Sequence, residues 1–127
     1  MLYAGLIYTD EFCYKNMKKI RENIDSGRKY VDPPFYCIVL NEVTSKIEFE
    51  NYVYLQQKHF KDNPPLLIGL AKDYDEAGKI VSYMVKDCFD KIGCLDYISY
   101  LASFESVDNL MTDDPEIIKV SGGKAHA

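Results

Sequence analysis

The longest regular pattern in this chain runs from Pro64 to Gly93, PPLLIGLAKDYDEAGKIVSYMVKDCFDKIG. Its first part, Leu66–Ala71, is a continuous apolar run that follows two prolines, which predicts a strand buried on both faces. Its second part carries apolar residues at helical spacing, which predicts a long helix packed flat on a sheet. The apolar positions of that helix are Ala77, Ile80, Val81, Met84, Val85, Cys88, Phe89 and Ile92.

Both ends of this helix have local signals. Asp73 and Glu76 have the spacing of a capping box, and Gly93 occupies the place of a left-handed C-cap residue. The turn before the helix could bind an anion with help from Lys72, but the carboxylate of Asp73 uses the same amide donors. Asp75 and Glu76 complement the helix dipole, so we expect no metal here.

Other segments carry weaker secondary-structure patterns. Thr9 is expected to cap a helix with apolar residues at helical spacing, which ends at Gly27. Asn51 interrupts the buried side of an alternating strand and marks either a bulge or the end of regular pairing. The expected elements are a strand over Leu2–Tyr8 at an edge or added to the sheet, a helix over 10–27, a central strand over Phe35–Leu40, an alternating strand over Lys46–Leu55 and a short third helix over 95–102.

These elements predict a single small α+β domain over residues 1–102. We expect an antiparallel or mixed sheet of three to four strands, with two main helices packed on one face and the order β-α-β-β-β-α-α. Residues 103–127 hold five acids and two bases and are expected to form an acidic C-terminal tail that is partly ordered at most. Within this tail, Ile117–Val120 could form an edge strand or pack against a partner.

Composition narrows the function classes. The chain has 127 residues, 47% of them hydrophobic, and a net charge of −5. Residues 1–102 are close to neutral, with 15 acids and 13 bases, so they lack the basic character typical of nucleic-acid-binding proteins. No apolar run has the length of a membrane span, and we expect a cytoplasmic protein. Abundant Tyr, Ile, Lys, Asp and Asn indicate an AT-rich genome, such as that of a low-GC bacterium, its phages or its mobile elements.

The titratable residues form no recognisable catalytic or metal-binding pattern in the sequence. His59 lies in a polar loop and His126 next to the C-terminus, and neither has a Ser, Cys or carboxylate partner in a recognisable arrangement. There is no Gly-rich phosphate loop or nucleophile elbow. The four cysteines form no CxxC pair, which favours buried thiols over a zinc site. They are Cys13, Cys37, Cys88 and Cys94. We therefore expect no enzyme, no cofactor and no metal.

The alternating strand offers a candidate binding face. Glu48, Glu50, Tyr52 and Tyr54 fall on the side expected to face solvent. Tyrosines interleaved with glutamates favour a protein contact over a phosphate backbone. The sequence therefore predicts a non-enzymatic protein-interaction module, a small accessory or inhibitory protein of bacterial, phage or mobile-element origin. Its partner would be a second copy in a homodimer or another protein.

Two alternatives remain. A small-molecule site could lie between helix and sheet. The other alternative is nucleic-acid binding through the basic first helix, by Lys15, Lys18, Lys19, Arg21, Arg28 and Lys29.

A resemblance accompanies the nucleic-acid alternative. Without the first strand, the order helix-strand-strand-strand-helix is similar to that of a double-stranded RNA-binding domain. Gly69-Leu70-Ala71-Lys72, before the last helix, looks like that family's loop and basic helix start. The resemblance implies RNA binding, although Asp73 and Asp75 stand where that family carries lysines.

Overall fold

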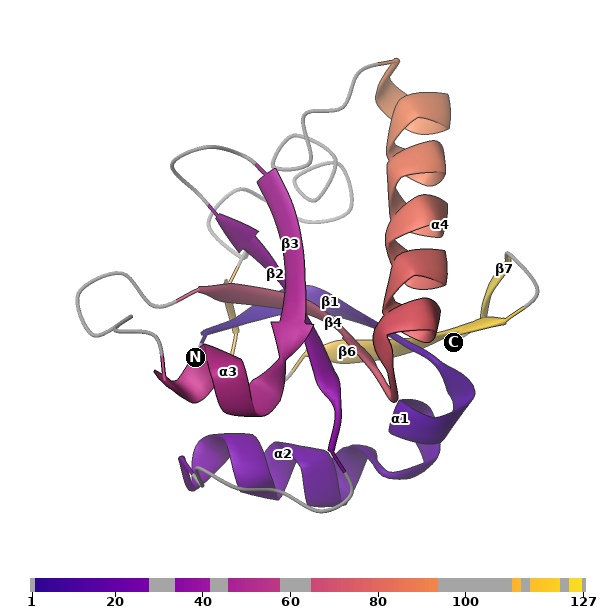
Figure 1. Cartoon of the computed structure of the whole chain (residues 1–127). Helices are drawn as coiled ribbons and strands as arrows, with labels where there is room; N and C mark the ends of the chain where they lie inside the picture. The colour runs from indigo at the N-terminus through magenta and orange to yellow at the C-terminus, as the bar shows by residue number, and fades with distance from the viewer. Residues whose placement is uncertain are drawn as a thin grey trace.

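The computed structural model describes residues 2–27, 34–41, 46–57, 65–93, 111–112, 115–121 and 124–126. The fold is α+β, as the sequence predicts, and Figure 1 shows its arrangement. The elements in chain order are β1 (Leu2–Thr9), α1 (Glu11–Lys15), α2 (Met17–Asp25), β2 (Tyr36–Asn41), β3 (Lys46–Asn51), α3 (Tyr52–Gln57), β4 (Leu66–Ala71), α4 (Tyr74–Ile92), β5 (Met111–Thr112), β6 (Glu116–Ser121) and β7 (Lys124–His126).

The strands form one mixed sheet in the order β3-β2-β4-β1-β6-β7, with β5 paired to β1. β1 runs parallel to β4 and β6, whereas β2 runs antiparallel to β3 and β4. β1 therefore lies inside the sheet and not at an edge. The expected three to four strands were too few, because the described residues form five strands of six or more residues and two shorter ones. The fifth long strand, β6, comes from the segment expected to be an acidic tail.

β4 and α4 form where the sequence predicts them. Every residue of β4 is buried. The Asp73 side chain caps α4 by accepting a hydrogen bond from the Glu76 amide at 2.9 Å, and Gly93 ends it with a φ of 70°. Gly69 is required by close packing, since a Cβ at this position would lie 2.9 Å from Cδ1 of Ile38.

Helices cover both faces of the sheet, which corrects the expectation that they pack on one face. The ring of Tyr8 in β1 lies 6.0 Å from that of Tyr83 in α4. The hydroxyl of Tyr3, in the same strand, donates to Asp25 in α2. In the sheet, Tyr3 aligns through Leu67 with Val39 of β2, and Tyr8 aligns through Gly69 with Ile38. Neighbouring residues of a regular strand point to opposite sides, so α4 and α2 lie on opposite faces. Figure 1 shows the same separation, with α4 on one side of the sheet and α1, α2 and α3 on the other.

The third strand is shorter than predicted. β3 ends at Asn51 and α3 begins at Tyr52, so the strand does not continue to Leu55. The Asn51 side chain accepts a hydrogen bond from the Val53 amide at 2.9 Å, a local turn that competes with strand pairing. The Tyr52 ring then packs against Phe35, with 4.8 Å between ring centroids. Asn51 therefore ends the regular pairing, which is one of the two roles that the sequence allows.

The first helix is divided and begins one residue later than predicted. Asp10, and not Thr9, is the N-cap, because its carboxylate accepts a hydrogen bond from the Cys13 amide at 2.8 Å. Asn16 separates α1 from α2, and its side-chain amide donates to the Phe12 carbonyl at 2.8 Å. The inner positions Cys13, Ile20 and Ile24 are buried, as their spacing predicts.

Part of the expected tail belongs to the sheet. β6 pairs with β1 on one side, and β7 covers its other side at Lys119–Ser121, so within the described sheet Ile117–Val120 is only partly an edge segment. Val120 is buried in the core. The short helix expected over 95–102 lies outside the described residues. None of the described helices has both the length and the apolar composition needed to cross a membrane.

Candidate functional site

The apolar stripe of α4 is wider than the area that the sheet covers. Ala77, Ile80 and Met84 are almost fully buried against it. Val85 is 37% exposed and Phe89 is 57% exposed, although the same helical pattern contains them. The sequence predicts both as core residues, and the structure places them at the surface.

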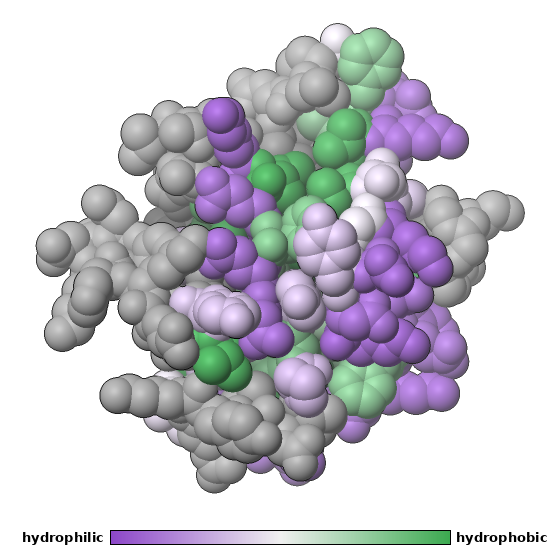
Figure 2. Space-filling view, viewed as in Figure 1, coloured by the Kyte–Doolittle hydropathy of each residue, from purple (hydrophilic) through white to green (hydrophobic). Residues whose placement is uncertain are grey.

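The exposed side of α4 faces the edge of the sheet formed by β3. The Tyr74 ring, 62% exposed, lies 5.1 Å from Phe49 in β3 and 6.2 Å from Tyr36 in β2. Val85 lies three turns further along the same side of the helix, and Phe89 follows it by one turn. Figure 2 shows apolar side chains at the surface in the band between β3 and α4. We call this band the β3–α4 surface and define it by Ile47, Phe49, Tyr74, Val85 and Phe89.

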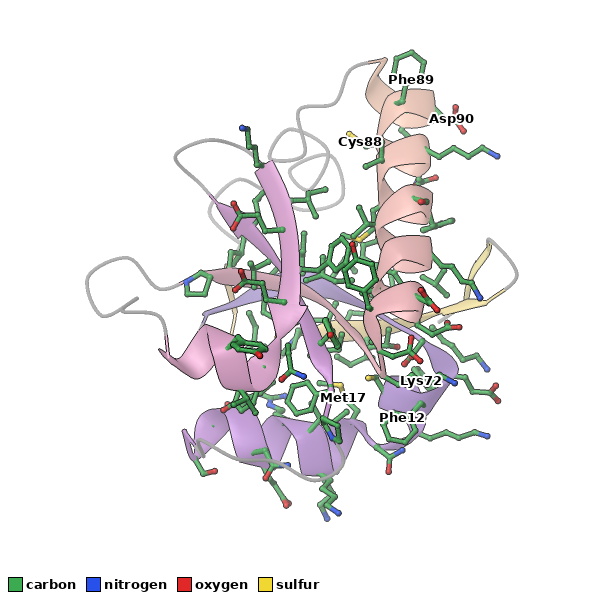
Figure 3. All side chains as sticks on the ribbon, viewed as in Figure 1. Phe12, Met17, Lys72, Cys88, Phe89 and Asp90 are labelled. Atoms are coloured by element: carbon green, nitrogen blue, oxygen red, sulfur yellow. The ribbon has the colours of Figure 1, made fainter. Side chains whose placement is uncertain are left out.

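Figure 3 shows the far end of this surface, where Phe89 projects from the last turns of α4 beside Cys88. Cys88 is buried, whereas Phe89 is not. Large apolar side chains gathered on one side of an exposed helix are typical of interaction sites, whereas single ones are ordinary. The arrangement can therefore bind an apolar partner surface.

Gly78 lies on the same side of α4, between Tyr74 and Val85. A glycine inside a helix costs about 1 kcal/mol relative to alanine, because the unfolded chain loses more conformational freedom. A Cβ at Gly78 would have nothing within 4 Å, so packing within the described fold does not require glycine there. The missing side chain leaves space for another molecule to approach the helix backbone.

β3 forms one edge of the sheet within the described part of the chain, where it pairs only with β2. The Tyr52 amide donates to the Phe35 carbonyl, which fixes the hydrogen-bond phase of the antiparallel ladder. By that phase, the amides of Glu48 and Glu50 point to β2, and those of Ile47 and Phe49 point away from the sheet. The backbone donors beside the β3–α4 surface are therefore directed outward.

The structure does not keep the four predicted interface residues on one face. Glu48 is exposed and Glu50 is half-buried, both on the side of β3 opposite to α4. Tyr52 is fully buried, and its hydroxyl donates to the Asn23 carbonyl at 3.3 Å. Tyr54 lies on α3 and is 66% exposed. The premise that Tyr52 faces solvent is wrong, because the chain turns at Asn51.

The basic first helix is partly neutralised by its own acids. Lys15 forms an ion pair with Glu11 at 3.1 Å, which lowers the pKa of the Glu11 carboxyl. Arg21 lies 3.6 Å from Asp25 and over the ring of Tyr3. The side chains of Lys18 and Lys19 are exposed, whereas Arg28 and Lys29 lie outside the described residues.

A second candidate site lies at the carboxyl ends of the neighbouring parallel strands β1 and β4. The helices that follow these strands, α1 and α4, leave toward opposite faces of the sheet, and α/β folds often bind ligands at such a position. Figure 3 shows Phe12, Met17 and Lys72 gathered near this edge. The carboxylate of Asp10, 3% exposed, accepts hydrogen bonds from the amides of Cys13 and Lys72, both at 2.8 Å. Because the Asp10 side chain occupies these donors, they are not available to a ligand. Asp10 instead links the start of α1 to the β4–α4 turn, and we call this link the Asp10 joint.

The described cysteines lie inside the core. Cys13, Cys37 and Cys88 are free thiols and buried. Burial raises the pKa of the Cys13 and Cys37 thiols, so both stay protonated. In the part of the chain that the structure describes, no group of three His, Cys, Asp or Glu side chains could hold a metal ion. Cys94 and His59 lie outside that part.

Comparison with known proteins adds no relative, since no family model, no curated protein and no solved structure matches this chain.

Proposed function

We propose that this protein is a non-enzymatic interaction module, of the accessory or inhibitory kind, that binds another protein through the β3–α4 surface. The observation that carries the proposal is the exposure of Val85 and Phe89 on a helix whose neighbouring apolar residues Ala77, Ile80, Met84 and Cys88 are buried. Both residues lie on the same side of α4 as Tyr74, whose ring contacts Phe49 of β3, and the outward amides of β3 can also bind a partner.

The free energy available from burying these apolar side chains in an interface supports this role. Complete burial of an exposed Val or Phe side chain contributes about 1.5–3 kcal/mol. Tyr74, Val85 and Phe89 are each partly exposed, so covering all three would contribute on the order of 3 kcal/mol. Contributions of this size are typical of the few anchor residues that dominate protein interfaces.

The test is affinity capture from the cells that produce the protein, followed by crosslinking and mass spectrometry. The double substitution Val85→Ser and Phe89→Ser removes the exposed apolar groups of α4. Lys86→Ala is the matched control, because Lys86 is exposed on the same helix outside the apolar stripe. We expect the wild-type and control proteins to retain a partner that the double variant loses. Retention of the same partner by all three proteins would contradict the proposal.

A further inference from the structure

We infer that the partner contributes a β-strand that pairs with the edge of β3 that no described strand covers, and that this strand alternates apolar and basic residues. The inference rests on the proposed function and specifies the partner's chemistry. Strand addition is a common mode of peptide recognition, in which backbone hydrogen bonds provide affinity and alternate side chains provide specificity.

The backbone of β3 is suited to this mode. The amides of Ile47 and Phe49, which point outward by the phase that the Tyr52–Phe35 hydrogen bond sets, are two residues apart. Donors at this spacing match the repeat of a β ladder. A helix lying on the surface would leave these backbone groups without partners, whereas a strand would satisfy them.

The two faces of β3 determine the partner's side chains. Ile47 and Phe49 lie opposite Leu40 and Ile38 on the α4 side of the sheet. Glu48 and Glu50 are on the other side of the same strand. Because opposed residues of paired strands share a face, the added strand would place apolar side chains toward α4 and basic side chains beside the glutamates.

α4 supplies a wall for the apolar side of the added strand. Tyr74 is exposed and contacts Phe49 of β3, and helical spacing places Gly78 and the exposed Val85 on the same side of α4. A strand added beyond β3 would pack the side chains on its α4 side against these residues of α4. The open space at Gly78 would receive one of them without displacing any atom of the protein.

A second copy of β3 fits this edge poorly. Every antiparallel register that pairs five or more residues of β3 with the same strand of another copy brings Glu48 against a glutamate or an apolar residue. Like charges directly opposite each other destabilise paired strands. Charged residues on an edge strand are also a usual protection against self-association. We therefore assign the edge to a different chain with basic residues.

The probe is a ten-residue peptide of alternating Val and Lys, blocked at both ends, and binding to the full chain is followed by fluorescence anisotropy. Two further peptides carry N-methyl groups on every Val or on every Lys. Only one edge of a bound strand faces β3, so we expect one of these two peptides to bind at least tenfold more weakly and the other to bind as before. Equal binding by both N-methylated peptides would overturn the inference.

Charge reversal tests the basic side of the partner. We expect Glu48→Lys to weaken binding of the Val–Lys peptide at least tenfold and to allow binding of a Val–Glu peptide. The matched control is Glu22→Lys, an exposed acid on α2, which should change neither affinity. Equal effects of the two substitutions would indicate non-specific attraction and overturn the inference.

Hydrogen exchange distinguishes a strand from other occupants. In the peptide complex, we expect the amides of Ile47 and Phe49 to exchange at least tenfold more slowly. Binding of an amphipathic Leu–Lys helical peptide without this protection would overturn strand addition and leave the proposed function intact. A dimer in sedimentation that Glu48→Lys alters would assign the edge to a second copy and would also overturn the inference. The capture test with Val85 and Phe89 decides the proposed function separately.

Discussion

Substitution of Asp10 by alanine tests how much the Asp10 hydrogen bonds at the ends of β1 and β4 contribute to stability. The Asp10 carboxylate is buried and accepts two backbone hydrogen bonds at 2.8 Å, one from the start of α1 and one from Lys72 before α4. Hydrogen bonds to charged groups contribute about 1.5–3 kcal/mol each, and the loss of the carboxylate leaves two donors unsatisfied. We therefore expect Asp10→Ala to lower the free energy of unfolding by about 3–5 kcal/mol.

Asp73→Ala is the internal comparison, because Asp73 also caps a helix but is exposed and accepts one backbone hydrogen bond, at 2.9 Å. Loss of such a cap costs about 1 kcal/mol. The assay is urea denaturation followed by far-ultraviolet circular dichroism. An Asp10→Ala cost no larger than that of Asp73→Ala would refute the reasoning that burial and the second hydrogen bond make Asp10 a joint.

Three further predictions follow from individual residues. Tyr52→Ser should lower the free energy of unfolding by about 3–5 kcal/mol, because it removes a buried ring, whereas Tyr54→Ser should change it by less than about 0.5 kcal/mol in the same assay. Burial raises the pKa of Tyr52 to about 12, above the value of about 10 for an unfolded chain, so stability should be unaffected below pH 10 and fall as the pH rises toward 12. Thermal melts should show that fall, and Tyr52→Phe should reduce it; an identical fall in the variant would contradict the assignment. Gly78→Ala should stabilise the free protein by about 0.5–1 kcal/mol in urea and weaken partner capture, and unchanged capture would show that nothing approaches the helix there.

The β4–α4 unit could be predicted because its signals are local. The apolar run, the Asp73 cap and Gly93 all act within a few residues, and tertiary contacts do not override them. The position of α4 on its own face of the sheet could not be predicted, because helical spacing shows that a helix has an apolar side but not which sheet face it covers. β6 could not be predicted as an inner strand, since parallel pairing with β1 joins segments more than 100 residues apart.

The candidate site was harder to predict than the fold. Alternation continues in the sequence through Tyr52 and Tyr54, but the Asn51 side chain turns the chain and buries Tyr52. Asn51 was the one local sign of this change. The exposure of Val85 and Phe89 has no sequence signal, because helical spacing does not show how much of an apolar stripe the sheet will cover. Glu48 remained exposed, as alternation predicts.

The claim that the partner binds at the β3–α4 surface is tested most directly by hydrogen exchange with mass spectrometry. The sample is the complex between the wild-type protein and its captured partner. We expect slower exchange in two places, the 46–51 segment of β3 and the exposed side of α4 around Val85. Slower exchange confined to α1 and α2, around Lys18 and Lys19, with β3 unchanged, would contradict the proposed surface and favour the basic helix instead.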